Sequence, residues 1–168
     1  MLSNFELESI AKTYQIPLVG VYQKDMLPYP AKQGNYIVNL QSSTEGNGTH
    51  YTCFVLDENK HAFYYDSFGA PPPKEVDTFV ISFKPIHYAY NKEIIQDLKN
   101  ECCGYYCLSF FLYRKHHNKE VIFNTALDYI KLFKDNTMKN LEILKDIFRR
   151  YTGKFIHPMI NRLFKLKK

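Results

Sequence analysis

The chain divides into a first half with strand-forming patterns and a second half with helix-forming patterns, and this division constrains the fold most. Up to about residue 90, short runs rich in Tyr, Ile, Val and Phe alternate with turn residues, as expected for β-strands. From Cys103 onward the pattern is helical. Strands followed by helices are typical of an α+β fold, whereas regular alternation would indicate a parallel α/β sheet. We therefore predict an α+β fold with a helical C-terminal half.

The predicted elements follow from local signals along the chain. The capping-box pattern at Ser3 and Glu6 predicts a helix that ends before Pro17. Strands are expected at residues 18–22, 35–40, 49–56, 61–66 and 85–90, with a hairpin turn at 57–60. Residues 75–83 fit either a helix or a strand. Further helices are expected at residues 103–115, at residues 121–133, and from Asn136 or Thr137 to about Tyr151.

Length and cysteine usage indicate one domain that needs no disulfides. A chain of 168 residues can bury a sizeable core, and we predict a single domain over residues 1–168. The first residues lack a long apolar run, so we expect no secretory signal. No run approaches the roughly eighteen apolar residues of a membrane span, so we expect no membrane partner. The four cysteines are therefore interpreted as reduced thiols.

Positive charge is concentrated at the C-terminal end. The basic C-terminal segment, residues 147–168, has no acidic residue and seven basic ones: Arg149, Arg150, Lys154, Arg162, Lys165, Lys167 and Lys168. The other 15 Lys and Arg residues stand against 17 acidic residues, so the rest of the chain has a net charge of −2. Such a cluster can bind nucleic acid through its phosphates. It is equally typical of a solvated face, and the sequence favours neither interpretation.

The stretch QDLKNECCGYYC, residues 96–107, contains the first catalytic candidates. Two adjacent cysteines, Cys102 and Cys103, precede a glycine and a helical run. At the start of a helix, unpaired backbone N–H groups and the helix dipole favour an anion, so a thiolate is stabilised there as a nucleophile. Gln96 lies seven residues before Cys103, from where its amide can donate a hydrogen bond to an oxyanion.

The predicted hairpin supplies a base and a group to orient it. His50 begins one strand, and Asp66 ends the partner strand 16 residues later. Because the hairpin brings the start of one strand opposite the end of the other, we expect the two side chains to be neighbours. An Asp beside a His fixes the tautomer of the ring and stabilises the imidazolium. With a thiol and an amide donor, these residues complete the parts of a cysteine-dependent acyl-transfer site.

Three segments in this order, GTHYTCF, YYDSFG and IIQDLKNECCGYYC, resemble the adenovirus maturation protease family (adenain and its relatives), and within it the proteases of virophages and Polinton elements. Members show a His followed by an aromatic residue, then an acidic residue near Phe-Gly, then Gln, and then Cys-Gly some seven residues on. The resemblance extends from near the start of the chain to about Leu112. The helices that follow are not diagnostic.

The resemblance implies a role for each candidate residue. His50 would be the base, Asp66 its orienter and Cys103 the nucleophile, while Gln96 and the backbone N–H of Cys103 would form the oxyanion hole. It favours Cys103 over Cys102, because the glycine follows the nucleophile and the Gln precedes it by seven residues. It also implies a papain-like fold of the adenain type, with a central mixed β-sheet flanked by helices.

The same resemblance implies a function and a setting. We expect a viral thiol protease that cleaves capsid and other virion precursor proteins during particle maturation, in the virion and in the viral factory in the cytoplasm of the infected cell, with DNA as a further candidate partner. The adenovirus enzyme is activated by a peptide disulfide-linked to a cysteine between the acid and nucleophile motifs. This chain has no cysteine between Asp66 and Cys102, so we expect no such tethered cofactor. No other cofactor and no metal are expected.

The sequence leaves three other interpretations open. The SUMO-specific proteases share the motif order, so an isopeptidase is an alternative, although its members usually carry a Trp after the His and this chain has none. A DNA-binding virion protein with a vestigial site is another. A zinc site would lack the paired C-x2-C ligands of known sites; its donors would be Cys102, Cys103, Cys107, His116 and His117. We expect Cys53, Cys107 and the aromatic residues 105, 106, 110 and 111 to be core residues.

Overall fold

The structure, a computed structural model, describes residues 1–45, 50–117 and 121–153. Its centre is a five-stranded sheet in the order β1-β2-β3-β4-β5. The strands are β1 (Gly20–Gln23), β2 (Gly34–Asn39), β3 (Tyr51–Leu56), β4 (His61–Tyr65) and β5 (His87–Tyr90). The outer pairs, β1 with β2 and β4 with β5, are parallel, and the inner pairs are antiparallel. The predicted α+β class with a mixed sheet is therefore confirmed.

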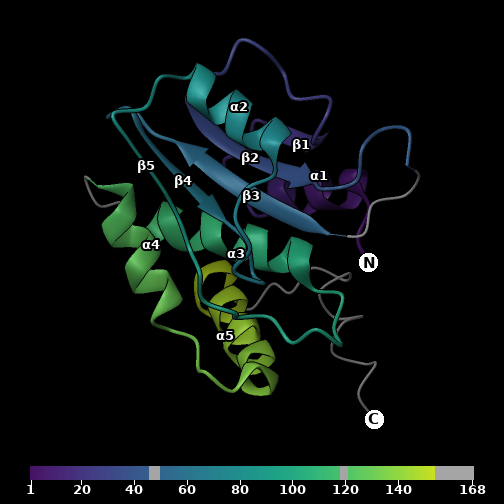
Figure 1. The fold of residues 1–168 in the computed structure, drawn as a ribbon. Coiled ribbons are helices and arrows are strands. Elements are labelled where there is room, and N and C mark those ends of the chain that lie inside the picture. The colour runs from purple at the N-terminus through teal and green to yellow at the C-terminus, as the bar shows by residue number, and fades with distance from the viewer. Residues whose placement is uncertain (46–49, 118–120, 154–168) are drawn as a thin grey trace.

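Helices cover both faces of this sheet. The α-helices of the described residues are α1 (Asn4–Thr13), α2 (Lys74–Ser82), α3 (Cys103–His116), α4 (Ile122–Ile130) and α5 (Asn140–Thr152). Figure 1 shows α2 on one face of the sheet and α3 on the other. Helix α4 lies beside α3 and also contacts β4 through Phe123, and α5 packs against α3. Between Cys103 and Gly153 the described residues are mainly helical, as predicted.

The central strand β3 is buried on both faces because it lies between two apolar layers. Phe54 and Leu56 pack toward α2, in a core that also contains Phe79. Cys53 and Val55 point the other way, into the core around α3. Alternate side chains of a strand point to opposite faces, so a strand that is covered twice has no polar face.

Helix α3 is the centre of the larger core. Every residue from Cys103 to Tyr113 is buried, which is the pattern of a helix enclosed on all sides rather than an amphipathic surface helix. The aromatic residues predicted to be core lie here: Tyr105, Tyr106, Phe110 and Phe111 are at most 2% exposed. Cys53 and Cys107 are buried as predicted.

The local signals set most of the element boundaries. The Ser3 side chain accepts from the Glu6 backbone N–H, and the Glu6 carboxylate accepts from the Ser3 N–H, so the predicted capping box is present. Residues 75–83, which fitted either state, lie within the helix α2 and its C-cap. The predicted third strand begins at Tyr51 in the structure, and Thr49 lies outside the described residues.

The last helix differs from the prediction in its first turn. The side chain of Asn136 caps a short 3-10 turn, Thr137–Lys139, and α5 begins only at Asn140. The buried amide of Asn140 donates to the carbonyls of Ile95 and Lys134, both at 2.8 Å. This contact links the start of α5 to the segment that carries Gln96. None of the helices in the described part of the chain is long and apolar enough to cross a membrane.

Candidate active site

His50 and Asp66 form a close, largely buried pair at one end of the β3–β4 hairpin. The Nε2 atom of His50 lies 2.7 Å from Oδ1 of Asp66, and their side chains are 15% and 2% exposed. The hairpin pairs Cys53 with Tyr65, so its continued register places Asp66 opposite Thr52, two residues from His50. An offset of two residues keeps both side chains on the same face and within diagonal reach. The predicted proximity is therefore present, although the two residues are not directly opposite.

The carboxylate of Asp66 is held in place by the chain around it. Its Oδ1 also accepts from the backbone N–H of Phe68 at 2.8 Å. The buried side chain of Asn91 clamps the Asp66 backbone, because its Oδ1 accepts the Asp66 N–H at 2.9 Å and its Nδ2 donates to the Asp66 carbonyl at 2.7 Å. Asn91 directly follows β5, so the parallel neighbour of β4 fixes the orientation of the acid.

These contacts change the charge state of His50. Burial disfavours the imidazolium, but the hydrogen bond to Asp66, the nearby Cys103 sulfur and the charges of both groups outweigh it and raise the pKa of His50 from 6.5 to about 9. The increase corresponds to about 3 kcal/mol of preferential stabilisation of the protonated ring. His50 is therefore positively charged at neutral pH.

Cys103 is the first residue of α3, at the position where a helix stabilises an anion. Its sulfur accepts the backbone N–H of Tyr51 at 3.4 Å, and the residue is 2% exposed. The glycine after it has a packing reason, because a Cβ on Gly104 would lie 2.7 Å from Cδ2 of Leu7 on α1. Gly104 thus allows α1 to pack closely against the start of α3.

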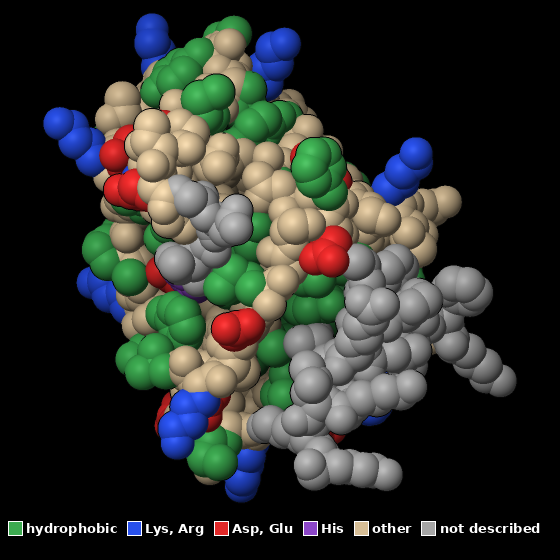
Figure 2. Space-filling view, turned by 90° about the vertical axis from the view of Figure 1, so that its right-hand side faces the viewer, with side chains coloured by type: hydrophobic (Ala, Val, Ile, Leu, Met, Phe, Trp, Pro, Cys, Tyr) green, Lys and Arg blue, Asp and Glu red, His purple; other side chains and the backbone are tan. Residues whose placement is uncertain are grey.

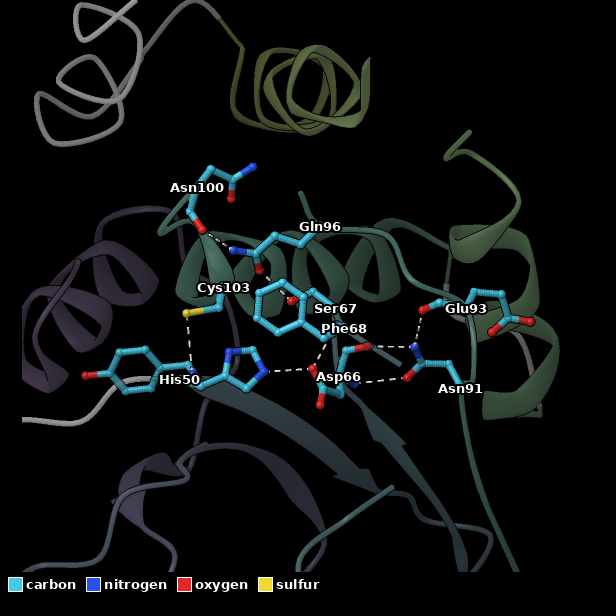
Figure 3. A network of polar contacts seen from close by, with 10 residues as sticks. His50, Asp66, Ser67, Phe68, Asn91, Glu93, Gln96, Asn100 and Cys103 are labelled. Carbon is cyan, nitrogen blue, oxygen red and sulfur yellow. Dashed lines mark hydrogen bonds and ion pairs between the residues drawn. The ribbon is translucent and has the colours of Figure 1, made fainter. Parts of the chain in front are cut away.

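The His50 ring lies between its two charged partners. Figure 3 shows it with the Asp66 carboxylate on one side and the Cys103 sulfur on the other. Its second nitrogen, Nδ1, is buried and makes no hydrogen bond within the described residues. A nitrogen that faces a thiol in this way is suited to take or return a proton at sulfur. Phe68 stacks on the ring at 4.7 Å between centroids and covers one of its faces.

The side-chain amide of Gln96 has a fixed orientation. Its Oε1 accepts from the Ser67 hydroxyl at 2.6 Å, and its Nε2 donates to the carbonyl of Asn100 at 2.8 Å. The residue is 1% exposed. An amide nitrogen carries two hydrogens, so one hydrogen remains for a ligand as far as the described residues show. Figure 3 shows Gln96 on the same side of His50 as Cys103.

The other sequence candidates lie elsewhere. Cys102 is the N-cap residue of α3 and is buried. Cys53 and Cys107 lie deeper in the core, where burial raises the pKa of the Cys107 thiol well above its usual value. His116 and His117 are at the opposite end of α3 from Cys102 and Cys103, so the zinc alternative does not assemble. No group of three potential metal ligands gathers within residues 1–45, 50–117 and 121–153.

The basic C-terminal segment is described only in part. Arg149 and Arg150 are exposed in the last turn of α5. Arg149 forms an ion pair with Asp146 at 2.8 Å, so part of its charge is compensated locally. Lys154, Arg162, Lys165, Lys167 and Lys168 lie outside the described residues. Figure 2 shows basic side chains spread over the face it presents, with acidic ones between them.

Several residues that shape the site have no role in the sequence prediction. Ser67 and Phe68 follow Asp66 directly, so their nearness to the acid was a usable signal. The sequence signal for Asn91 was weaker: it is a polar residue at the end of a predicted strand. No sequence signal pointed to the Tyr51 N–H, because every residue other than proline has this backbone donor.

The motif and the geometry are the observations that bear on function. Comparison with models of protein families gives no match, and comparison with curated proteins gives none either.

Proposed function

We propose that this protein is a cysteine endopeptidase with Cys103 as nucleophile, His50 as base and acid, Asp66 as orienter and Gln96 as oxyanion donor. One observation carries the proposal: the largely buried His50 ring, held by a carboxylate at 2.7 Å, lies beside a thiol at a helix start. The reactive form of a cysteine is the thiolate, and the ring nitrogen that faces the sulfur can hold the proton that the thiol releases. The motif order His, Asp, Gln, Cys supports the same assignment.

In the first half of the proposed reaction, the Cys103 thiolate attacks the scissile carbonyl carbon and a C–S bond forms. The carbonyl oxygen becomes an oxyanion, which accepts hydrogen bonds from Gln96 Nε2 and from the backbone N–H of Cys103. That N–H lies at the first position of α3 and has no acceptor within the helix. The C–N bond then breaks, and the His50 imidazolium gives its proton to the leaving amine.

The second half releases the acyl group. Neutral His50 takes a proton from water as the water oxygen attacks the thioester carbon. The C–S bond breaks, the carboxylic acid product leaves, and the thiolate and imidazolium are restored. Asp66 holds the ring through Nε2 throughout, which leaves Nδ1 to move the proton.

The wider assignment rests on the motif resemblance. It comprises a papain-like fold of the adenain type, virion precursor proteins as substrates, and action in virions and in viral factories of the cytoplasm. A mixed sheet with the catalytic helix packed on one face is compatible with that fold. DNA as a partner rests on the charge of the basic C-terminal segment.

A covalent probe tests the enzymatic proposal. We would incubate the protein with a peptide vinyl sulfone, which adds to active-site thiolates, and map the adduct by mass spectrometry. Labelling confined to Cys103, and lost in His50→Gln, is the expected result. Equal labelling of denatured and folded protein, or labelling of another cysteine, would reject the assignment. Incubation with capsid precursors of a candidate virus and mapping of the new termini would then identify the substrate.

A further inference from the structure

The structure assigns Ser67 as the positioning residue of the oxyanion donor. We infer that its hydroxyl holds the Gln96 side-chain amide with the nitrogen toward the reacting carbonyl. This inference rests on the proposed peptidase function, in which Gln96 donates to the oxyanion. Ser67 itself touches no reacting atom, so its effect on catalysis passes through Gln96.

Three hydrogen bonds connect Ser67 to the segment that carries Gln96. The Ser67 hydroxyl donates to Gln96 Oε1 at 2.6 Å. The Ser67 carbonyl accepts the backbone N–H groups of Ile95 at 2.8 Å and Gln96 at 3.0 Å. Ser67 is 2% exposed and Gln96 is 1% exposed, so water does not readily replace a lost contact.

The orientation of the amide decides whether it helps or hinders catalysis. A half-turn of the side-chain amide exchanges its oxygen and nitrogen, and an oxygen facing the oxyanion would repel it. Ser67 disfavours that half-turn by donating to the oxygen, and the Asn100 carbonyl disfavours it by accepting from the nitrogen. Removal of the hydroxyl leaves a buried amide oxygen without its donor, which favours tilted arrangements of the amide.

Ser67 and its neighbour Asp66 serve the two halves of the site. Asp66 directly follows β4, and Ser67 lies in the turn after it, in which the Gly69 N–H donates to the Asp66 carbonyl at 2.9 Å. Asp66 faces His50, and Ser67 faces Gln96 (Figure 3). A single dipeptide at the end of β4 thus fixes both the base and the oxyanion donor. Asn91 holds that dipeptide by its hydrogen bonds to the Asp66 backbone.

The kinetic test is a double-mutant cycle. We expect Ser67→Ala to lower kcat about tenfold with little change in KM, because the hydroxyl acts on transition-state stabilisation rather than on substrate binding. In a Gln96→Ala background the same change should have almost no further effect, since its target is absent. Ser109→Ala is the matched control, because the Ser109 hydroxyl is equally buried in α3 and bonds only Tyr106 and Tyr129 within the described residues.

A second measurement does not depend on activity. In 15N-labelled protein, the side-chain amide signals of Gln96 are those lost in Gln96→Ala. We expect these signals to shift and to exchange faster with water in Ser67→Ala, and to stay in place in Ser109→Ala. Unchanged Gln96 signals would overturn the positioning role even if the wild-type protein had no peptidase activity. Given an active wild type, full kcat in Ser67→Ala, or a tenfold loss that persists in the Gln96→Ala background, would overturn it too.

Discussion

The Asp66 carboxylate lies 2.7 Å from Nε2 of His50, and this contact leaves the other ring nitrogen, Nδ1, directed away from the acid. The tautomer of the ring is therefore set by a residue that does not face the thiol. With Nε2 bound to the carboxylate, the proposed proton transfer at sulfur would pass through Nδ1. The pH behaviour of the site follows from this arrangement.

We predict that stability contributed by His50 decreases between about pH 6.5 and pH 9. The pKa of His50 in the folded protein, about 9, is above its ordinary value of 6.5. The stabilisation is therefore fully present below pH 6.5 and is lost as pH rises through the folded-state pKa. Urea unfolding at both ends of this range should show a loss of about 3 kcal/mol that is missing in His50→Gln. An equal loss in both proteins would place its origin elsewhere.

Activity should decrease on the alkaline side of the same range. Expulsion of the amine needs a protonated His50, so kcat/KM is expected to fall as pH rises through about 9. Asp66→Asn removes the carboxylate that raises the pKa of His50, so its alkaline limb should move to lower pH and its maximum should be reduced. A pH–rate profile of each protein checks this. An alkaline limb at the same pH in both proteins would contradict the assigned role of Asp66.

The two adjacent cysteines should differ sharply. Cys103→Ala is expected to abolish peptide cleavage, because it removes the atom that forms the acyl bond. Cys102→Ala should retain most of the activity, since Cys102 is the N-cap residue and its side chain makes no capping hydrogen bond. Initial rates with a fluorogenic peptide separate the two. An inactive Cys102 variant beside an active Cys103 variant would reverse the assignment.

Loss of the oxyanion donor should lower the turnover rate but not the reactivity of the Cys103 thiol toward an alkylating reagent. Gln96→Ala is expected to reduce kcat about a hundredfold, in line with the loss of one oxyanion-hole hydrogen bond. Alkylation of Cys103 by iodoacetamide develops no oxyanion, so its rate should remain close to that of the wild type. If alkylation slows as much as cleavage, then Gln96 acts on the structure of the site rather than on the oxyanion.

The turn after Asp66 should tolerate only glycine at position 69. Gly69 has φ +72°, and a Cβ there would lie 2.5 Å from the Lys92 carbonyl oxygen. Gly69→Ala is expected to lower the free energy of unfolding by about 2 kcal/mol or more. Gly153→Ala is the matched control, with φ +70° but no atom of the described residues within 4 Å, so it should cost about 1 kcal/mol. Equal losses would show that the contact with Lys92 is relieved by small movements.

The basic C-terminal segment should give weak DNA binding that decreases steeply with salt. Phosphate contacts release counterions and ignore base sequence. Fluorescence anisotropy of labelled duplex DNA would compare wild type with a variant in which Lys154, Arg162, Lys165, Lys167 and Lys168 are changed to Gln. A control variant would change five exposed lysines elsewhere: Lys12, Lys32, Lys74, Lys84 and Lys115. Equal loss of binding in both variants would show that total charge, rather than this segment, attracts the DNA.

Local patterns predicted the elements of this fold well because they report local physics. The capping box of α1 and the β3–β4 hairpin are set by neighbouring residues, and both are present. Residues 75–83 stayed ambiguous because β-branched residues such as Val76 and Val80 are also common in strands. In the structure Val76 and Val80 lie on one face of a helix that is buried in the same core as Phe54. The parallel pairing of β1 with β2 and of β4 with β5 depends on contacts across the sheet, which no local pattern contains.

The sequence predicted the side chains that meet in the candidate site, but not the residues that hold them in place. Side chains that carry chemistry, such as His50 and Cys103, belong to few residue types and stand out by spacing. The clamp by Asn91 and the hydroxyl of Ser67 use common polar residues, which occur in turns for many other reasons. Their roles appear only when β5 and the turn after β4 are brought beside α3.

Gly104 lets Leu7 of α1 pack onto the start of α3, so the Cys103 thiol reaches its place only when these distant segments of the chain meet. His50 and Asp66 belong to one hairpin and can meet early, because only 16 residues separate them. The sulfur joins them from 52 residues beyond Tyr51, once α3 is docked against the sheet and against α1. An incompletely folded chain therefore carries its base and acid apart from its thiol. Under the proposed function, such a chain cannot cleave its neighbours while it folds.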